Sequence, residues 1–445
     1  MVGPDEVIDE LGAPVETGST GRRVQRPPTH WADLDETGRR RGVEELGLAG
    51  FRANQVSRHY FERLEADPEQ WTDLSAADRS GLRQFFPPLL TELVRRQADR
   101  GTTVKTLYRL FDSVLVESVT MRYLRSGRGQ GLGGSSDEEP VGTSRSTLCV
   151  SSQAGCGIGC PFCATGQAGL TRNLTAAEIV EQVRLAMVTL ASGDLNPGPG
   201  PLNNVVFMGM GEPLANYRAV MTAVRAICGP TPSGFGLSAR GITVSTSGLV
   251  PRINDLANEK LPLTLAVSLH APDDKLRDEL VPLNRRWNLA QLLDAARSYF
   301  DVTGRRVSIE YAMMRDINDQ GFRADLLAKQ LLTRGRGWVH VNLIPLNPTP
   351  GSKWTASRRA DEAEFIARLE AHRIPVTVRD TRGQDIDGAC GQLAAAVGQS
   401  AQGGLDDARL SVAVAKTRPA DETLVSCVAS SFSDRQARSE PKPST

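Results

Sequence analysis

The sequence predicts an α/β fold in which helices cover a parallel β-sheet. Between residues 147 and 397, short apolar runs with strand character alternate with longer segments of helical periodicity. Thr175 and Glu178 have the spacing of a capping box at the start of the first helical segment. Repeated strand–helix units of this kind join parallel strands, and they therefore imply one sheet with helices packed against it.

The expected elements follow one another in a regular order. The strands are expected at residues 147–151, 204–208, 241–245, 263–268, 306–312, 339–344 and 375–379. The helices are expected at residues 175–192, 216–228, 289–300, 323–334 and 360–372. The sequence has no short internal repeat of the solenoid type.

The region before the first of these strands begins with a tail and a small helical unit. Residues 1–30 are rich in Gly, Pro and Arg without periodicity, so we expect them to be disordered. Residues 31–100 have a mostly helical pattern, with helices expected at Arg52–Glu65, Leu74–Phe85 and Pro88–Ala98. This pattern predicts a helical accessory domain.

Two further strands and two unstructured stretches complete the chain. Thr103–Leu110 and Ser113–Tyr123 alternate like strands joined by a turn. Residues 125–146 are rich in Gly, Ser and acidic residues, and we expect a flexible, solvent-exposed insertion there. The core is therefore expected to run from 101 to 397. Residues 398–445 lose the periodic pattern and are expected to form a disordered tail.

The composition limits the class of protein. With 445 residues the chain is long enough for two folded units and a large core. Its 52 Lys and Arg residues balance 52 Asp and Glu residues, so the net charge provides no bulk attraction to nucleic acid. Seven cysteines, three of them clustered, do not match a disulfide-stapled secreted domain. No signal peptide and no run of about 18 apolar residues is apparent, which favours a cytoplasmic protein.

The three clustered cysteines are the strongest chemical signal. Cys156, Cys160 and Cys163 are spaced C-x-x-x-C-x-x-C in a glycine-rich loop that follows a strand. Three thiolates can hold three irons of a 4Fe–4S cluster, and the fourth iron then stays open for another ligand. A closed zinc site is the alternative, but it requires four ligands, and no His lies near this loop. The spacing therefore favours an iron–sulfur cluster.

This loop resembles the cluster loop of radical S-adenosylmethionine (SAM) enzymes. The wider block 147–174 is similar to the RlmN-type adenosine C2-methyltransferases of 23S rRNA and tRNA, whose close relatives are the Cfr-type C8-methyltransferases. The resemblance implies that the open iron binds SAM, and that one electron from the cluster cleaves SAM to a 5′-deoxyadenosyl radical. It also implies a partial (β/α)6 radical SAM barrel, with active residues at the carboxyl ends of the strands, and a small N-terminal helical domain that helps to hold RNA.

Residues after several strands match the SAM-binding positions of this family. Gly211 and Glu212 follow the strand at 204–208 and resemble the element that hydrogen-bonds the SAM amino group. A Ser or Asn in such a place is by itself an ordinary turn residue, but a common placement at successive strand ends indicates one site. The resemblance implies SAM contacts at Gly211, Glu212, Ser245, Ser268, Leu269, His270 and Asn347.

Two further cysteines and one glutamate have roles that the resemblance implies. Cys390 matches the methyl-accepting cysteine of the RlmN type, although a lone cysteine is more often a small buried residue. It takes a methyl group from one SAM, and a second SAM supplies the radical that joins this group to the adenine ring. Cys149 then resolves the protein–RNA thioether and leaves a disulfide bond. Glu117 accepts the ring proton.

The same resemblance implies the partners and leaves alternatives. It implies 23S rRNA, at the peptidyl transferase centre, and tRNA, next to the anticodon, as substrates. It further implies an electron donor such as flavodoxin, a monomeric state and no membrane partner. The surroundings of Glu117 and residues 385–393 look more like the C2 enzymes than the Cfr type. A Cfr-type C8-methyltransferase and a non-catalytic RNA-binding protein with a structural cluster are the alternatives.

Overall fold

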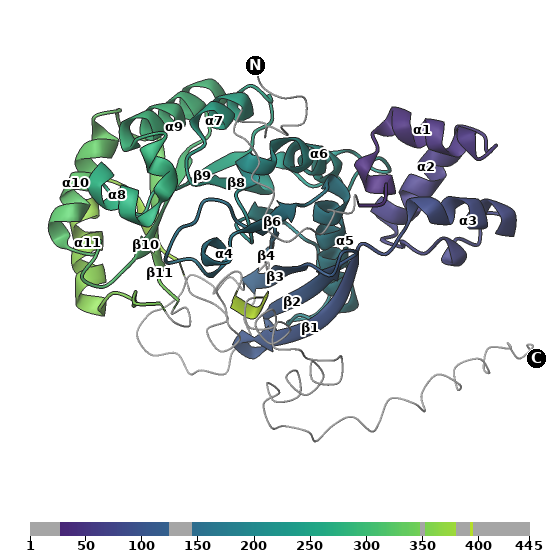
Figure 1. Cartoon of the computed structure of the whole chain (residues 1–445), viewed down its shortest axis with the longest axis horizontal. Helices are drawn as coiled ribbons and strands as arrows, with labels where there is room; N and C mark the ends of the chain where they lie inside the picture. Colours follow the sequence, from purple (N-terminus) through teal and green to yellow (C-terminus); the bar gives the residue numbers. More distant parts are fainter. Residues whose placement is uncertain (1–26, 124–144, 348–351, 380–391, 395–445) are drawn as a thin grey trace, which may run out of the picture. The chain divides into compact units, whose positions relative to one another are not determined.

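The computed structural model describes residues 27–123, 145–347, 352–379 and 392–394, which all belong to one compact unit of the chain. Its centre is a ten-stranded sheet with the strand order β1-β2-β3-β4-β7-β8-β9-β10-β11-β12 (Figure 1). The predicted tails and the predicted insertion fall almost entirely outside the described residues.

The sheet has an antiparallel part and a parallel part. The strands β1 to β4 pair antiparallel, and every pairing from β4 to β12 is parallel. The strands are β1 (Leu90–Ala98), β2 (Thr103–Leu110), β3 (Leu115–Tyr123), β4 (Arg145–Cys149), β7 (Asn204–Phe207), β8 (Ile242–Thr246), β9 (Thr264–Ser268), β10 (Val307–Met313), β11 (Val339–Pro345) and β12 (Val376–Val378).

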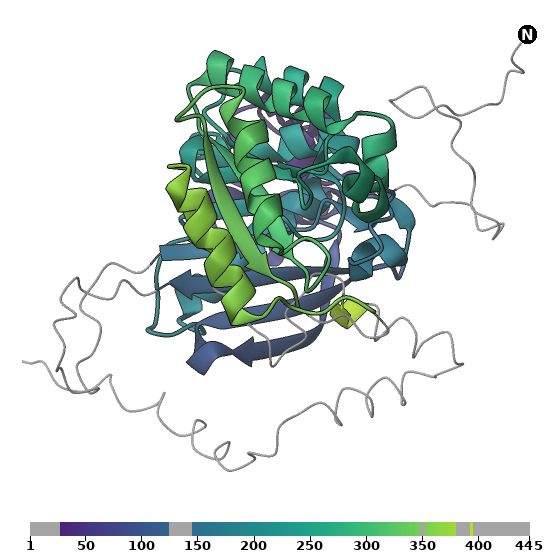
Figure 2. The same ribbon diagram turned by 90° about the vertical axis from the view of Figure 1, so that its left-hand side faces the viewer.

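Helices connect the parallel strands and lie along the outside of the curved sheet (Figures 1 and 2). They are α5 (Ala176–Ser192), α6 (Tyr217–Cys228), α7 (Val250–Ala257), α8 (Asp274–Leu280), α9 (Leu289–Thr303), α10 (Gly321–Leu332) and α11 (Arg359–Ala371). The predicted α/β fold with a partial barrel is confirmed. The helices α7 and α8 are not predicted because their 8 and 7 residues are too few to establish a periodicity. In the part of the chain that the structure describes, no helix has the length and apolar character needed to cross a bilayer.

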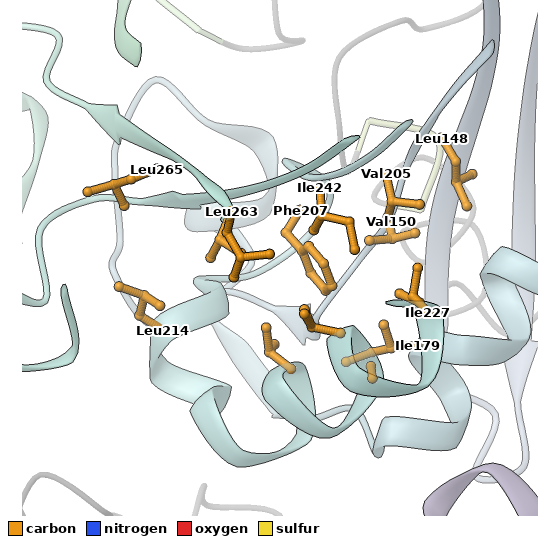
Figure 3. Packing of buried hydrophobic residues seen from close by; sticks show 14 of the residues in the cluster. Leu148, Val150, Ile179, Val205, Phe207, Leu214, Ile227, Ile242, Leu263 and Leu265 are labelled. Carbon is orange, nitrogen blue, oxygen red and sulfur yellow. The ribbon is translucent and has the colours of Figure 1, made fainter. Parts of the chain in front are cut away.

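The core lies between the parallel strands and the helices that cover them. Figure 3 shows the side chains of Val205, Phe207 and Ile242 close to Ile179 of α5 and Ile227 of α6. All five residues are buried. In β7 and β9 most residues are buried, whereas in β8 and β11 buried residues alternate with partly buried ones, and both patterns are typical of strands.

The N-terminal helical segment packs against this barrel. It contains α1 (Glu36–Glu45), α2 (Arg52–Ser57) and α3 (Ala76–Leu82). The hydroxyl of Tyr60 donates a hydrogen bond of 2.7 Å to the carboxylate of Glu181 on α5. The guanidinium of Arg39 donates to the carbonyl of Ser233, beyond α6, at 2.8 Å. Both residues are buried, so these bonds anchor the helical segment to the core.

One predicted helix in this region is wrong. Residues 88–98 were expected to be helical, but Leu90–Ala98 form strand β1, which pairs antiparallel with β2. A β-bulge between Glu92 and Val94 adds one residue to this strand. The apolar residues Leu90, Leu93 and Val94 therefore have a helix-like spacing, although the backbone is extended.

Removing the ring of Phe207 should leave a cavity in this core. We expect Phe207→Ala to lower the free energy of unfolding by about 3–5 kcal/mol, because the side chain is 1% exposed and its neighbours collapse only in part. Phe322→Ala is the matched control, because this ring is 60% exposed and its loss should change stability by less than about 0.5 kcal/mol. Urea denaturation measures both, and equal effects would contradict this description of the core.

Candidate active site at the carboxyl ends of the strands

A cavity of about 210 Å³ opens at the carboxyl ends of the parallel strands. Parallel strands bring their carboxyl ends to one edge of the sheet, and this edge is where α/β proteins bind ligands. The cavity collects five of the seven residues that the sequence assigned to SAM, and they follow or end β7, β8 and β9: Gly211, Glu212, Ser245, Ser268 and His270.

Glu212 is the buried carboxylate of this cavity. Its Oε1 accepts a hydrogen bond from the amide of Leu214 at 3.1 Å, and its Oε2 accepts one from the amide of Ser247 at 2.7 Å. Its own amide donates to the Oε1 of Gln153 at 2.8 Å. Burial raises the pKa of Glu212 above its ordinary value, although these donors oppose the shift. Side-chain hydrogen bonds from Thr246 and Ser247 add to these contacts, so the carboxyl group is fixed in orientation.

The glycine turn beside Glu212 has no room for side chains. Gly211 has a φ of +102°, and a Cβ at this position would lie 2.5 Å from the Cβ of Gln153. A Cβ on Gly209 would lie 2.5 Å from the carbonyl oxygen of Val150. The turn therefore packs directly on the backbone that leads into the cysteine loop, and the two ligand-binding segments form one rigid unit.

Six other lining residues are absent from the sequence-based prediction, and three of them have polar or charged side chains: Ser247, Glu310 and Arg379. Glu310 lies in β10 opposite Ser268 of β9. Its two oxygens accept hydrogen bonds from the hydroxyl of Ser308 at 2.6 Å and from the side-chain amide of Asn342 at 2.7 Å. A charged residue inside a buried, otherwise apolar strand is the signal that could have found it.

His270 occupies the turn after β9. Its Nδ1 accepts a hydrogen bond from the amide of Ala312 at 3.0 Å, and its ring meets the edge of Phe162 at 5.2 Å between centroids. Burial, and secondly the charge of Arg277, lowers the pKa of His270 to about 3. The imidazole is therefore neutral at physiological pH and carries its proton on Nε2.

Arg277 of α8 forms hydrogen bonds to backbone carbonyls at the ends of β8 and β9. Its guanidinium donates to the carbonyls of Ser247 at 2.6 Å, Ser268 at 3.2 Å and Leu269 at 3.1 Å. Burial lowers the pKa of Arg277 to about 10, so the group is still charged at neutral pH. One buried cation thus contacts three carbonyls at or just after the ends of β8 and β9.

The two remaining predicted SAM residues have different positions. Leu269 is fully buried and does not line the cavity; its amide donates to the carbonyl of Glu310 at 3.0 Å. Asn347 follows β11, and its Oδ1 is buried without a hydrogen-bond partner among the described residues. A buried polar atom in this state indicates a group that a bound polar ligand could satisfy.

The cysteine loop is closed by a small hairpin, β5 (Gln153–Gly155) and β6 (Leu170–Asn173). The amide of Cys156 donates to the carbonyl of Gly169 at 2.8 Å, and the amide of Cys163 donates to the carbonyl of Cys160 at 3.1 Å. These bonds fold residues 156–163, which carry all three thiols, into a compact loop.

The three thiols fit a cluster better than a single metal ion. Burial is the main cause that raises the pKa of Cys156 to about 12, with Glu212 and Cys163 adding to it, and the pKa of Cys160 is raised in the same way. The thiols thus lie close enough to influence one another, and three thiolates are one ligand short of a closed zinc site. Cluster ligands bind separate irons and need no common point.

Glu117 lies in a buried contact beside this site. Its Oε2 is 2.9 Å from the Nζ of Lys105 on β2, and both side chains are almost completely buried. Its Oε1 accepts a hydrogen bond of 2.6 Å from the amide of Ala394. The carboxylate of β3 is therefore joined to a neighbouring strand and to the segment that follows Cys390 in the sequence.

Cys149 shares this region of the sheet. It ends β4 opposite Val119 of β3, so its side chain is on the same face as Glu117, two residues before Val119. Cys149 is 6% exposed and packs with Met121 and Val206. Cys390 lies outside the described residues, and so does any disulfide that it forms with Cys149.

Comparisons with known proteins agree with this arrangement. Residues 150–327 match the Radical SAM superfamily model. "Probable dual-specificity RNA methyltransferase RlmN" of Nocardioides sp. is 61% identical over 376 residues, which cover 84% of this chain and 95% of that protein. The protein of the same name from Kocuria rhizophila is 59% identical and covered to 94%. A solved radical SAM methyltransferase from Sphaerobacter thermophilus has a TM-score of 0.73 and 41% identity, over 82% of this chain and 99% of that one.

Protonation of His270 should destabilise the fold. The pKa of His270 is about 3 in the folded protein and 6.5 in its ordinary state. The neutral imidazole therefore contributes its full stabilisation of the fold above about pH 6.5, and this contribution is lost as the pH falls. Between pH 6.5 and 5 we expect this residue to remove up to about 1.4 kcal/mol per pH unit. Urea midpoints of the wild type and of His270→Asn, which tolerates the φ of +59° here, measure this. Identical pH slopes would show that His270 does not titrate as described.

Proposed function

Because the chain belongs to the RlmN family of radical SAM RNA methyltransferases, we propose that it methylates carbon 2 of adenosine in RNA. The proposed substrates are 23S rRNA, at the peptidyl transferase centre, and tRNA, next to the anticodon. The observation that carries the proposal is the convergence of residues from three strand ends on one cavity beside the three-cysteine loop. The names of the relatives describe a dual specificity for RNA, which supports a proposal with two kinds of RNA substrate.

The residues present fit the cofactors of this chemistry. Cys156, Cys160 and Cys163 would hold a 4Fe–4S cluster, since their thiols lose protons when iron binds. The lining of the cavity offers the buried carboxylate of Glu212 for an ammonium group and the guanidinium of Arg379 for a carboxylate, the two charges of an amino acid moiety such as that of SAM. Bound together, cluster and SAM supply the radical chemistry that an electron-poor ring carbon requires. Two SAM molecules per turnover are proposed.

Cys390 and Cys149 are proposed to act as a pair. Cys390 accepts the methyl group as a thioether, and Cys149 later attacks the sulfur of Cys390, so that the product carbon leaves and a disulfide remains to be reduced. The anchor of Ala394 on Glu117 supports this pairing. The chain between residues 390 and 394 spans at most roughly 14 Å, and Cys149 and Glu117 share one face of the sheet.

Glu117 is proposed to accept the ring proton. Both of its oxygens have partners in this structure, Lys105 and the amide of Ala394. To accept a proton, the carboxylate of Glu117 has to release the amide of Ala394 and contact the substrate instead, while Lys105 stays beside it.

The remaining parts of the proposal concern organisation and partners. We propose that the helices within residues 31–100 form the RNA-binding accessory domain. Strand β1 (Leu90–Ala98) joins the sheet of the radical SAM core, which continues through residues 101–397. A one-electron donor such as flavodoxin, a monomeric state and a cytoplasmic location complete the proposal. The Cfr-type alternative is not favoured, because the relatives compared above bear the RlmN name.

The cluster assignment predicts a metal content. Anaerobically reconstituted protein should hold about four irons per chain, and Cys156→Ala, Cys160→Ala or Cys163→Ala should lose most of this iron and all reductive SAM cleavage. Cys228→Ala is the matched control, because this partly buried thiol on α6 lies outside the loop, and it should keep iron and cleavage. Stoichiometric zinc in place of iron would refute the assignment.

The cysteine pair predicts distinct products. Wild type should form 2-methyladenosine in rRNA and tRNA fragments, as mass spectrometry of digested nucleosides shows, whereas 8-methyladenosine would assign the protein to the Cfr type. Cys390→Ala should form neither product nor a protein–RNA adduct. Cys149→Ala should accumulate an adduct that survives denaturing gels, because the thioether can form but not be resolved. A Cys149→Ala protein that turns over freely would exclude this role.

A further inference from the structure

A second hollow, of about 510 Å³, lies directly against the cysteine loop. It shares no lining residue with the cavity at the strand ends. Two of its residues belong to the loop, between Cys156 and Cys160, and the others come from the turn after α8. They are Gly157, Ile158, Pro282, Leu283, Arg285 and Arg286. A protein seated here would be separated from the cluster by the loop backbone.

The hollow has an apolar floor. Ile158 and Leu283 pack against the same buried cluster, to which Leu276 and Leu280 of α8 contribute. Gly157 is exposed and carries no side chain that could cover the backbone next to Cys156. The floor is therefore apolar and held in place by the core beneath it.

The rim of the hollow is basic. Arg285 and Arg286 are exposed, and the guanidinium of Arg286 lies over the ring of Trp287, 4.7 Å from its centroid. On the adjacent helix α8, Asp274 and Asp278 accept hydrogen bonds of 2.9 and 2.7 Å from the side chain of Asn284. Two adjacent cations thus stand at the edge of an apolar surface.

We propose that this hollow is the docking site of the electron donor, and that the donor is a small protein with an acidic rim around its redox group. The inference rests on the proposed cluster. Electron-transfer complexes use small interfaces in which charges guide the partners and a limited apolar contact seats them. The hollow combines these features directly against the loop between Cys156 and Cys160, because Gly157 and Ile158 line it.

The same features are less suited to RNA. A single-stranded nucleic acid is held by a groove of several spaced cations and by aromatic rings on which bases stack. None of the six residues around the hollow is aromatic, and its two arginines are adjacent. The substrate also has to reach the cavity at the strand ends, which is lined by other residues.

The step at this surface is a one-electron transfer. The reduced flavin of the donor loses one electron and becomes the semiquinone, and the oxidised cluster gains that electron. No bond is formed or broken between the two proteins, so the complex has only to hold the two groups near each other and then dissociate. A charge-guided, short-lived contact suits this requirement.

Reversal of the two rim charges tests the proposal. The variant Arg285→Glu/Arg286→Glu, with its cluster reconstituted, is mixed with reduced flavodoxin in a stopped-flow instrument. We expect reduction of the cluster to be at least about tenfold slower than in wild type at low salt, with a difference that shrinks as salt is added. The dissociation constant for oxidised flavodoxin, measured separately, should rise by a similar factor.

Two controls distinguish a failure of the docking site from a failure of the cluster. Arg240→Glu/Arg336→Glu makes the same charge change at exposed residues that precede β8 and β11, at the opposite ends of the strands, and should leave the rate unchanged. Iron content and reduction by a small uncharged photoreductant should be normal in all variants. Protein without a cluster would refute the proposed function itself. If Arg285→Glu/Arg286→Glu is reduced by flavodoxin at the wild-type rate, the docking site is wrong. If this variant loses only affinity for RNA, the surface binds RNA instead.

Discussion

The parallel alignment of the strands from β4 to β11 is the constraint on which the site depends. Parallel pairing fixes the register of each strand against the next, for example Glu310 against Ser268. Residues that are far apart in the sequence therefore end at the same edge. Each connection returns the chain to the start of the next parallel strand, so each new strand end adds one more group to the same edge. A ligand with several different polar groups can be bound there without any long loop.

The edge is rigid because its unpaired backbone groups are satisfied from inside. Arg277 contacts the carbonyls of Ser247, Ser268 and Leu269, and Glu212 accepts the amides of Leu214 and Ser247. Two buried charges of opposite sign thus organise neighbouring turns. Groups that are already oriented need not be ordered when a ligand binds, and this lowers the entropic cost of binding.

The sequence was sufficient where one local rule determined the structure. The buried parallel strands were readable as apolar runs, and α5 from its capping box at Thr175. The strand β1 was misread because a bulge gave it the spacing of a helix. Arg277 was missed for another reason: its role arises from contacts between elements, and nothing in the neighbouring sequence marks such contacts. Glu310 had a local signal, its charge inside an apolar strand, but its partner Asn342 is on another strand. The pairing of Glu117 with Lys105 and Ala394 is of the same kind.

The buried pair of Lys105 and Glu117 has a consequence for how the chain can vary. Replacing Glu117 alone would leave the Lys105 ammonium in the interior without that carboxylate, and replacing Lys105 alone would do the converse. The two positions are therefore epistatic, and an evolutionary path that changes both has to cross an intermediate of lower stability. A single substitution of Glu117 also releases the backbone of Ala394. Loss of turnover in such a protein would combine three effects: the lost contact with Lys105, the lost contact with Ala394 and the lost proton acceptor. A double-mutant cycle with Lys105 would isolate the first of them.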